Sequence, residues 1–538
     1  MPLETAALAP SRADRRAVST TPLSVVIITK NEERNLPSCL ASVKEWAAEI
    51  VVVDDHSSDR TRAIAAQHGA HVFTRALDIE GRHRNWAYAQ ASQPWVLSLD
   101  ADERVTPTLA EEIRDILQRG TTLHGFSIPL RNYIGQRPIR YGGWYPAYKF
   151  RLFLKDKARY EEASVHPRIL MDDERAVGHL RCDIEHYGFK DFADMAAKQN
   201  RQTTLEAEKW ASSARRMSLA KGAWRAVDRF WRAYIGKGGW REGFLGFMLA
   251  YLGGFYQLLS YAKYWERRSP LAVIARPTGP KQSVLPDGSI PLSVVVITKN
   301  EEARLGACLA SVTWAKEVIV VDDLSTDRTR AIAAQHGAHV FTRALDIEGR
   351  HRNWAYAQAS QPWVLSLDAD ERVTPTLAQA IAALIREDPP EEGCGIPRKN
   401  FIGSYWVRHG GWYPADQLKL FRRGYFRYEE SEVHPRSQFI GNSIRILKEP
   451  LDHFSYRDIA DFLAKLNDHT TREAAKWLRA GRRMSLGKAL WRALDRGLRA
   501  YAWKQGFRDG FVGLIVAEFA VFYQLLSYAK YWEGRTAP

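Results

Sequence analysis

The stretch Pro94–Glu103 reads PWVLSLDADE, and the same ten residues recur as Pro362–Glu371. Its apolar part is short, uncharged and contains Val, Leu and Trp, which predicts a buried parallel strand rather than a helix. Two carboxylates one residue apart follow where that strand ends. At the carboxyl edge of a sheet, such a pair suits a hard cation that also touches phosphate oxygens. A polar strand end is the alternative, because Asp is common in turns, but the repetition favours a functional pair.

Most of the 538-residue chain is a duplication. Residues 23–267 match residues 292–534 nearly end to end, and Asp59–Ala110 is identical to Asp327–Ala378. The period is far too long for a solenoid, so it predicts a tandem pair of domains. We expect a lead-in (1–21), a first domain (22–188) with a helical segment (189–266), a linker (267–290), and a second domain (291–455) with its helical segment (456–538).

The composition is that of a globular protein, with 45% hydrophobic and 26% charged residues. Four Cys without CxxC or Cys/His metal spacing exclude a disulfide framework and favour a reducing compartment. Residues 1–21 are polar and lack the apolar core of a signal peptide, so we expect a disordered lead-in.

Strand and helix patterns alternate in each copy, which predicts an α/β fold with a mostly parallel, doubly wound sheet. In the first copy we expect strands at residues 23–29, 50–55 and 70–74, and helices at 35–46, up to 67 with Ser57 or Ser58 as N-cap, and 84–91. Ligands of such sheets bind beyond the carboxyl ends of the strands. The polar side chains expected to gather there are Asn31, Glu32, Asp54, Asp55, Asp100 and Asp102.

These motifs resemble a known enzyme family. SVVIITKNEE, IVVVDDHSSD, RHRNWAYA and LSLDADE are similar to family 2 glycosyltransferases with the GT-A nucleotide-sugar fold. GGWYPAYKFRLF (Gly142–Phe153), YEEASVHPR (Tyr160–Arg168) and Gly243–Glu266 resemble one subgroup, the glucosyltransferases of the lipopolysaccharide inner core. The second copy carries the same set, so the resemblance implies two tandem GT-A domains.

The resemblance implies a metal and a nucleotide-sugar site in each copy. Asp102 and Asp370 would hold Mg²⁺ or Mn²⁺ against the diphosphate of a UDP-sugar, with Asp100 and Asp368 assisting or binding ribose. Such a metal neutralises the departing nucleoside diphosphate. The side chains implied at the nucleotide sugar are Glu32, Asp54, Asp55, Arg84 and Asp100, and in the second copy Glu301, Asp322, Asp323, Arg352 and Asp368.

Three of these positions have more specific implied roles. Asp54 and Asp322 would accept from the uracil N3–H, and Glu32 and Glu301 would lie near the ribose. Arg84 would clamp the diphosphate, because a guanidinium matches phosphate oxygens in a forked geometry. A solvated charge on a helix face is the alternative for that arginine.

Inversion at the anomeric carbon requires a carboxylate base that takes the proton of the acceptor hydroxyl. The candidates are Glu161, Glu162 and His166, and in the second copy Glu429, Glu430 and His434. We favour Glu162 and Glu430. The sequence departs from the subgroup here, because Pro167 and Pro435 follow the histidines where an acid is common. The alternative is an exposed strand end with a structural histidine.

The positive charge of the chain is concentrated behind each catalytic domain. Lys209–Arg241 has a net charge of +8 and Lys476–Arg508 one of +9, whereas the whole chain has +15. Aromatic and apolar residues at helical spacing accompany this charge: Trp224, Val227, Trp231 and Tyr234, then Trp491, Leu494, Leu498 and Tyr501. A basic amphipathic helix indicates an anionic membrane surface. Nucleic acid is the competing partner, disfavoured because no nucleic-acid-binding module accompanies the charge.

Each basic stretch is followed by twenty apolar residues, Gly243–Ala262 and Gly510–Ala529, which are long enough to span a bilayer. A single crossing at Gly243 would place the two copies on opposite sides of the membrane, whereas nucleotide sugars are cytoplasmic. We therefore expect monotopic, peripheral attachment at the cytoplasmic face of the inner membrane.

The resulting prediction is an inverting, metal-dependent hexosyltransferase that moves glucose from UDP-glucose to a lipid-linked saccharide such as lipopolysaccharide core. One alternative is transfer to a polyprenyl phosphate. Another is that one half is a non-catalytic membrane-binding or pairing module, which the intact acids in both copies disfavour.

Overall fold

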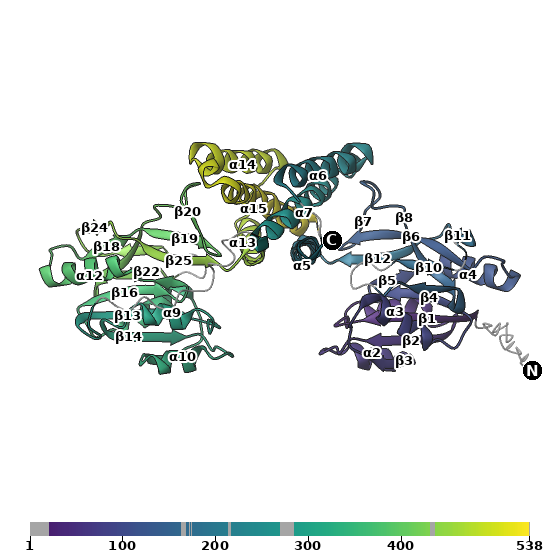
Figure 1. The fold of residues 1–538 in the computed structure, drawn as a ribbon, viewed down its shortest axis with the longest axis horizontal. Helices are drawn as coiled ribbons and strands as arrows, with labels where there is room; N and C mark the ends of the chain where they lie inside the picture. Colours follow the sequence, from purple (N-terminus) through teal and green to yellow (C-terminus); the bar gives the residue numbers. More distant parts are fainter. Residues whose placement is uncertain are drawn as a thin grey trace, which may run out of the picture. The chain divides into compact units, whose positions relative to one another are not determined.

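The computed structural model describes residues 21–162, 168–171, 173, 175–213, 217–268, 285–430 and 436–536 (Figure 1). The chain divides into two compact units. The first contains Met1–Met195 and Ala226–Gly254, and the second contains Ala196–Arg225 and Phe255–Pro538. One catalytic domain falls in each unit, while the domain boundaries given above remain a proposal.

The first unit is built on one large mixed sheet. Its strands, in spatial order, are β3 (His71–Thr74), β2 (Ala47–Asp54), β1 (Thr21–Thr29), β4 (Trp95–Asp100), β8 (Ala147–Leu154), β6 (Gly125–Ile134), β12 (Ile184–Phe189) and β5 (Glu103–Val105). The first four are parallel, and β8 is antiparallel to both β4 and β6. Smaller strands complete the unit: β7 (Arg137–Pro138), β9 (Ala158–Tyr160), β10 (Ile169–Met171) and β11 (Val177–His179).

Strand β1 is central because both of its faces are apolar. Val25 and Ile27 pack with the helices on one side, and Val26 packs with the helix on the other. Such two-sided burial is the reason that parallel strands read as continuous β-branched runs. The helices are α1 (Leu36–Val43), α2 (Thr61–Gln67) and α4 (Pro107–Arg119) on the first side, and α3 (Glu80–Ala89) on the second.

The expected N-cap of α2 is wrong. Neither Ser57 nor Ser58 caps the helix; instead the Asp59 carboxylate accepts from the Thr61 amide at 3.0 Å. The hydroxyl and the amide of Ser57 are directed at Asp54, where they close the turn after β2.

The second unit repeats this α/β architecture with its strands divided between two main sheets. The first sheet runs β15 (His339–Thr342), β14 (Ala315–Asp322), β13 (Ile290–Thr298), β16 (Trp363–Asp368), β21 (Gln417–Arg422), β18 (Gly393–Ile396) and β24 (Ile444–Ile446). The second runs β17 (Glu371–Arg372), β25 (Leu451–Tyr456), β19 (Arg398–Ile402) and β20 (Tyr405–Val407), and a hairpin pairs β22 (Phe426–Tyr428) with β23 (Ser437–Phe439). The helices are α9 (Leu305–Ala310), α10 (Thr329–Gln335), α11 (Glu348–Ala357) and α12 (Pro375–Glu387). The expected tandem α/β fold is confirmed.

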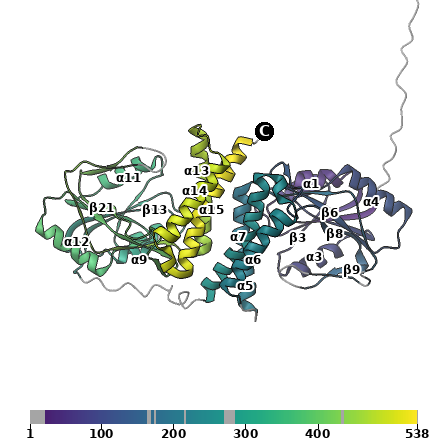
Figure 2. The ribbon, with the colours of Figure 1, turned by 90° about the horizontal axis from the view of Figure 1, so that it is seen from above.

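A helical segment follows each catalytic domain. The first contains α5 (Phe192–Ser212), α6 (Leu219–Trp231) and α7 (Phe244–Arg268), and the second α13 (Ile459–Arg479), α14 (Leu486–Leu498) and α15 (Gly510–Thr536). Figures 1 and 2 show α13, α14 and α15 lying side by side. Buried lysines fasten these helices: Lys530 on α15 donates to Asn467 and Thr470 of α13, and Lys263 on α7 makes the matching contacts to α5.

Helices α6 and α14 each continue into a π-helical turn, Arg232–Gly236 and Arg499–Trp503. Two helices that follow, Phe244–Arg268 and Gly506–Thr536, are long and apolar enough to cross a membrane by length and composition. Because 61% of the most apolar window of each is buried inside the protein, packing against protein accounts for much of that apolar surface.

Candidate active site

A buried cluster of two carboxylates and one guanidinium lies at the end of β4. Asp100 ends the strand, and its amide donates to Oε2 of the fully buried Glu103 at 2.9 Å. Arg151 on β8 donates to Asp100 Oδ2 at 2.6 Å and also to Glu103 Oε1. Burial opposes ionisation of Asp100, but Arg151 and Arg84 outweigh it and hold the pKa of that carboxyl well below its usual range. The charge of Asp100 is therefore already balanced by the protein.

Asp102 faces a histidine from a distant strand. Its Oδ2 atom lies 3.6 Å from Nε2 of His186 on β12. Asn132 fixes the imidazole ring: its Nδ2 donates to the Trp144 carbonyl at 2.6 Å, so its Oδ1 accepts from His186 Nδ1 at 2.7 Å. With one proton on Nδ1, the neutral ring turns the Nε2 lone pair toward the carboxylate. A carboxylate oxygen and an imidazole nitrogen in this arrangement fit a divalent cation.

The environment of the Asp102–His186 pair also favours protonation of the histidine. Burial lowers the pKa of His186, but its hydrogen bond to Asp102 and the nearby carboxylates raise it above its ordinary value overall. Among the described residues, no three His, Cys, Asp or Glu side chains form a cluster that could hold a metal. A cation held by Asp102 and His186 therefore needs oxygen ligands from a substrate, and a diphosphate supplies them.

Arg84 is not a solvated charge on a helix face. Its side chain, only 16% exposed, places Nη2 at 3.5 Å from Asp100 Oδ1 and donates through Nε to Glu80 at 3.2 Å. The guanidinium carbon lies 5.6 Å from the centre of the Tyr160 ring. Nη1 is buried without a hydrogen-bond partner among the described residues. An unpaired buried donor is costly, and an anionic ligand oxygen would satisfy it.

The acids after β2 are less accessible than expected. Asp54 has no exposed surface and accepts from both the amide and the hydroxyl of Ser57. Asp55 accepts from Lys30 Nζ at 2.8 Å and from the Leu77 amide at 3.0 Å. Asp54 therefore holds this turn together, and its expected contact with a uracil base stays a prediction. Asp55, whose side chain is 13% exposed, is the more accessible acid.

Glu32 lies in the turn after β1, where its amide donates to Thr61 Oγ1 at 2.8 Å. Its carboxylate accepts from the Asn35 side chain at 2.8 Å. In the second copy, Glu301 instead receives two bonds from the guanidinium of Arg304, at 2.7 and 3.0 Å. The two sites therefore differ at this turn.

The candidate bases lie at the exposed end of β9. Glu162 accepts from Arg82 Nη2 at 2.9 Å, and Arg82 belongs to α3, the helix that carries Arg84. Glu161 is exposed beside it. His166 lies outside the described residues, so the structure says nothing of its role.

The second copy repeats this arrangement. Glu430 accepts from Arg350 on α11 at 3.0 Å, and Glu429 is exposed. His434 lies outside the described residues.

The second acid cluster is held by a lysine. Asp368 and Glu371 share the Nζ atom of Lys419, at 3.0 and 2.7 Å. His453 Nε2 lies 3.6 Å from Asp370 Oδ1, and the other ring nitrogen contacts the Asn400 side chain at 2.7 Å. The remaining expected positions also recur: Asp322 is fully buried, Asp323 pairs with Lys299, and Arg352 lies 3.5 Å from Asp368.

One contact in the second copy changes an expected metal ligand. Arg304 Nη1 lies 3.5 Å from Asp370 Oδ2. The carboxylate expected to hold a metal in the second copy thus already has a protein cation beside it, and the two sites differ at this position.

A sequence profile described as Glycosyl transferase family 2 matches residues 24–168 and 293–450, one stretch in each copy. Together these stretches are more than half of the chain. The chain belongs to this family.

Several known family members are similar to about half of the chain. The lipopolysaccharide core biosynthesis glycosyltransferase LpsC of Rhizobium meliloti (strain 1021) is 32% identical over 272 residues, which are 48% of this chain and 95% of that protein. An uncharacterized glycosyltransferase of Rickettsia felis (strain ATCC VR-1525 / URRWXCal2) is 26% identical over 255 residues, 45% of this chain and 90% of that protein.

Among solved structures, S. aureus TarS 1-349 in complex with UDP-GlcNAc is 17% identical, with 45% of this chain and 91% of that chain covered and a TM-score of 0.26. At that score the likeness carries no argument about the site.

Sequence reasoning missed His186, Asn132 and Arg151, together with their second-copy counterparts. The two copies contain a signal for the first two residues: EHYGF aligns with DHFSY, and RNYIG aligns with KNFIG. Polar residues kept in register within otherwise divergent strands are candidates for a shared site.

We expect Arg151→Met to destabilise the protein, because Glu103 loses the cation that balances it in a buried position. Breaking a buried ion pair costs about 3–5 kcal/mol. Burial raises the pKa of Glu103 to about 7, and losing Arg151 raises it further. A buried acid with a raised pKa loses stability as pH rises from its unfolded pKa of about 4.3 toward its folded value. In urea-induced unfolding, the midpoint of the first transition should therefore fall by more at pH 8 than at pH 5.5.

The matched control is Arg151→Lys, which introduces the residue that the second copy uses at this position. Its first urea transition should stay close to that of the parent protein. Equal losses in the two variants would contradict the ion-pair argument.

Proposed function

We propose that the protein is an inverting hexosyltransferase that moves glucose from UDP-glucose to a lipid-linked saccharide. The observation that carries the proposal is the pairing of Asp102 with His186 beside the buried cluster of Arg84 and Asp100. This arrangement supports a cation and a guanidinium acting side by side, as a nucleoside diphosphate leaving group requires. The similarity to LpsC supports the saccharide acceptor.

The protein's own residues would position the donor. The buried Nη1 donor of Arg84 would bind a phosphate oxygen, and Asp55 and Glu32 would lie along the nucleoside. Asp102 and His186 would hold Mg²⁺ or Mn²⁺, which would offset the charge of the departing diphosphate. Asp100, whose charge Arg151 balances, would keep the turn rigid rather than supply a metal ligand.

Glu162 would act as the general base. The exposed carboxylate would take the proton of the acceptor hydroxyl as that oxygen bonds to the anomeric carbon and the UDP oxygen leaves, with no covalent enzyme intermediate. Its ion pair with Arg82 orients it toward the helix that carries Arg84. Glu430 with Arg350 would do the same in the second copy.

A membrane-bound acceptor is supported by the exposed faces of the basic helices. Large apolar side chains lie in solvent there, and Trp224 is 71% exposed and Trp491 68% exposed. The others are Val227, Trp231, Ile235 and Trp240, then Leu494, Leu498, Tyr501, Trp503 and Phe507. Tryptophan and arginine together on one helix suit the interface of an anionic bilayer. We therefore place the enzyme on the cytoplasmic face of the inner membrane.

In the first unit, a cavity of about 270 Å³ lies between the end of α6 and the turn at Gly142 and Gly143, called the glycine turn below. Its lining includes Gly143, Arg229, Arg232 and Lys237. Three cations around one cavity suit an anionic group on the acceptor. The same observation favours a second candidate, transfer to a polyprenyl phosphate. An assay that offers both acceptors with UDP-glucose distinguishes them by which one becomes labelled.

Asp102→Ala combined with Asp370→Ala should abolish sugar transfer, because the first site loses the carboxylate proposed to hold its cation and the second loses the carboxylate that faces Arg304. We expect at least a thousandfold loss of turnover with an unchanged circular dichroism spectrum, measured as release of UDP in the presence of Mn²⁺ and acceptor membranes. The control is Asp115→Ala, which removes an acid with an exposed side chain on α4 and should leave turnover unchanged. Undiminished turnover in the double variant would contradict the site.

The protein should pellet with anionic liposomes and be partly released by high salt. Each basic residue near an anionic surface contributes about 1 kcal/mol, and salt screens this within a Debye length. Replacing Arg225, Arg229 and Arg232 by Glu should weaken binding, and adding the same change at Arg492, Arg496 and Arg499 should weaken it far more. Binding by the two basic helical segments is mutually reinforcing if both reach the same membrane surface.

The matched control for this experiment is the neutral liposome, to which the parent protein should bind much less. Failure to bind anionic liposomes, together with salt-dependent binding to duplex DNA, would overturn the membrane assignment in favour of nucleic acid.

A further inference from the structure

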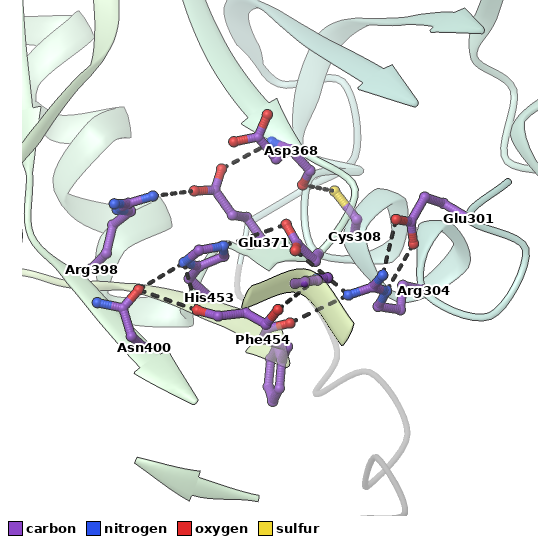
Figure 3. A network of polar contacts seen from close by, with 12 residues as sticks. Glu301, Arg304, Cys308, Asp368, Glu371, Arg398, Asn400, His453 and Phe454 are labelled. Carbon is purple, nitrogen blue, oxygen red and sulfur yellow. Dashed lines mark hydrogen bonds and ion pairs between the residues drawn. The ribbon is translucent and has the colours of Figure 1, made fainter. Parts of the chain in front are cut away.

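The Asp-Ala-Asp turns of the two copies, Asp100–Asp102 and Asp368–Asp370 (the DAD turns), are identical, but the charged side chains around them differ. Arg304 stands where the first copy has Asn35, and Arg398 stands where it has Leu130. Both arginines reach the acids of the second site, because Arg398 Nη1 lies 3.7 Å from Glu371 Oε1 and Arg304 contacts Glu301 and Asp370 (Figure 3). The second site thus has two more positive charges around the same acids.

Arg304 joins two acids of the second copy. Its Nε and Nη2 atoms bond the two oxygens of Glu301 at 2.7 and 3.0 Å, while Nη1 lies 3.5 Å from Asp370 Oδ2. Nη1 also donates to the Phe454 carbonyl at 3.4 Å. The side chain is 18% exposed, so the surrounding protein fixes the position of its charge.

In the first copy, Asn35 is neutral and its side chain donates to Glu32. The ion pair recorded for Asp102 in the described part of the chain is the one with His186. Among the described residues, Asp102 therefore has no arginine beside it, whereas Asp370 has Arg304.

A guanidinium beside Asp370 works against a divalent cation at the same carboxylate, because the two like charges would repel each other in a mostly buried site. The same guanidinium can do part of the work of that cation. It is always charged, and its Nη2 atom carries a second hydrogen, which the bond to Glu301 does not use, for a phosphate oxygen. The donor set of the second copy therefore does not fit a metal as that of the first copy does.

We propose that Arg304 takes the place of the divalent cation in the second copy. The first copy then binds the nucleotide diphosphate with Mn²⁺ or Mg²⁺ at Asp102 and His186. The second copy binds the nucleotide diphosphate through Arg304 and Arg352, without a metal. This inference rests on the proposed function, because it assumes that both copies bind a nucleoside diphosphate.

The test counts UDP and Mn²⁺ on the full chain in separate measurements. Calorimetry should give two UDP per chain with Mn²⁺ present and one UDP per chain in EDTA. Electron paramagnetic resonance at saturating UDP should give one tightly bound Mn²⁺ per chain. Asp102→Asn should remove that Mn²⁺ and leave the UDP site that persists in EDTA.

A reciprocal exchange provides matched variants, since each introduces the residue that the other copy already has. Arg304→Asn should create a second Mn²⁺ site, strengthening Mn²⁺ binding in the second copy at least a hundredfold, and should abolish UDP binding in EDTA. Asn35→Arg should remove Mn²⁺ from the first copy. An unchanged circular dichroism spectrum shows that each variant is folded.

The possible outcomes distinguish a failure of the inference about Arg304 from a failure of the proposed function. Two UDP and two Mn²⁺ per chain in the parent protein would overturn the inference while leaving the donor assignment intact. One Mn²⁺ that Asp370→Asn removes and Asp102→Asn does not would also overturn it. Absence of UDP binding under every condition would overturn the proposed function, and the inference would fall with it.

Discussion

One buried cation in each copy holds the site in shape: Arg151 between Asp100 and Glu103, and Lys419 between Asp368 and Glu371. Two carboxylates cannot both remain ionised in a buried position unless a cation pairs with them. The antiparallel strand β8 must therefore lie next to β4, because it is β8 that supplies Arg151. This pairing consumes the first acid of the DAD turn and leaves the second one for a ligand.

The fold could be predicted from the sequence where the signal is local. Strands β1, β2 and β4 are continuous apolar runs, and the structure places them within a few residues of their expected bounds. The site was only half predictable, because its other half comes from far along the chain. His186 lies beside the DAD turn because β12 pairs with β5, where His186 is opposite Glu103, and with β6, where it is opposite Asn132. No spacing in the sequence encodes these pairings.

Accessibility was the other quantity that the sequence concealed. An aspartate after a strand has the same letter whether it faces a ligand or closes its own turn. Asp54 closes a turn with Ser57, so it is fully buried, whereas its neighbour Asp55 is partly exposed. Asp54 closes its own turn because the backbone brings Ser57 within hydrogen-bond reach of it. Since Ser57 is bound to Asp54, it does not cap α2.

The helical segment and the site of the first unit are joined by a short series of hydrogen bonds. The Lys237 carbonyl after the π-helical turn accepts from the Gly142 amide at 2.9 Å, and the nearby Trp144 carbonyl accepts from Asn132. Asn132 in turn fixes His186. The second unit repeats the first contact between Lys504 and Gly410 at 2.8 Å. A surface that holds the basic helix would thus also position the glycine turn beside the cation site.

The pattern of divergence between the copies follows from the same geometry. The identical stretch Asp59–Ala110 and its repeat contain Arg84 and the DAD turn, so these groups are the same in both copies. The two arginines that contact the acids of the second copy lie outside that repeat: Arg304 where the first copy has Asn35, and Arg398 where it has Leu130. The identical central segment therefore keeps the acids the same in both copies, while the flanking segments place different side chains around them.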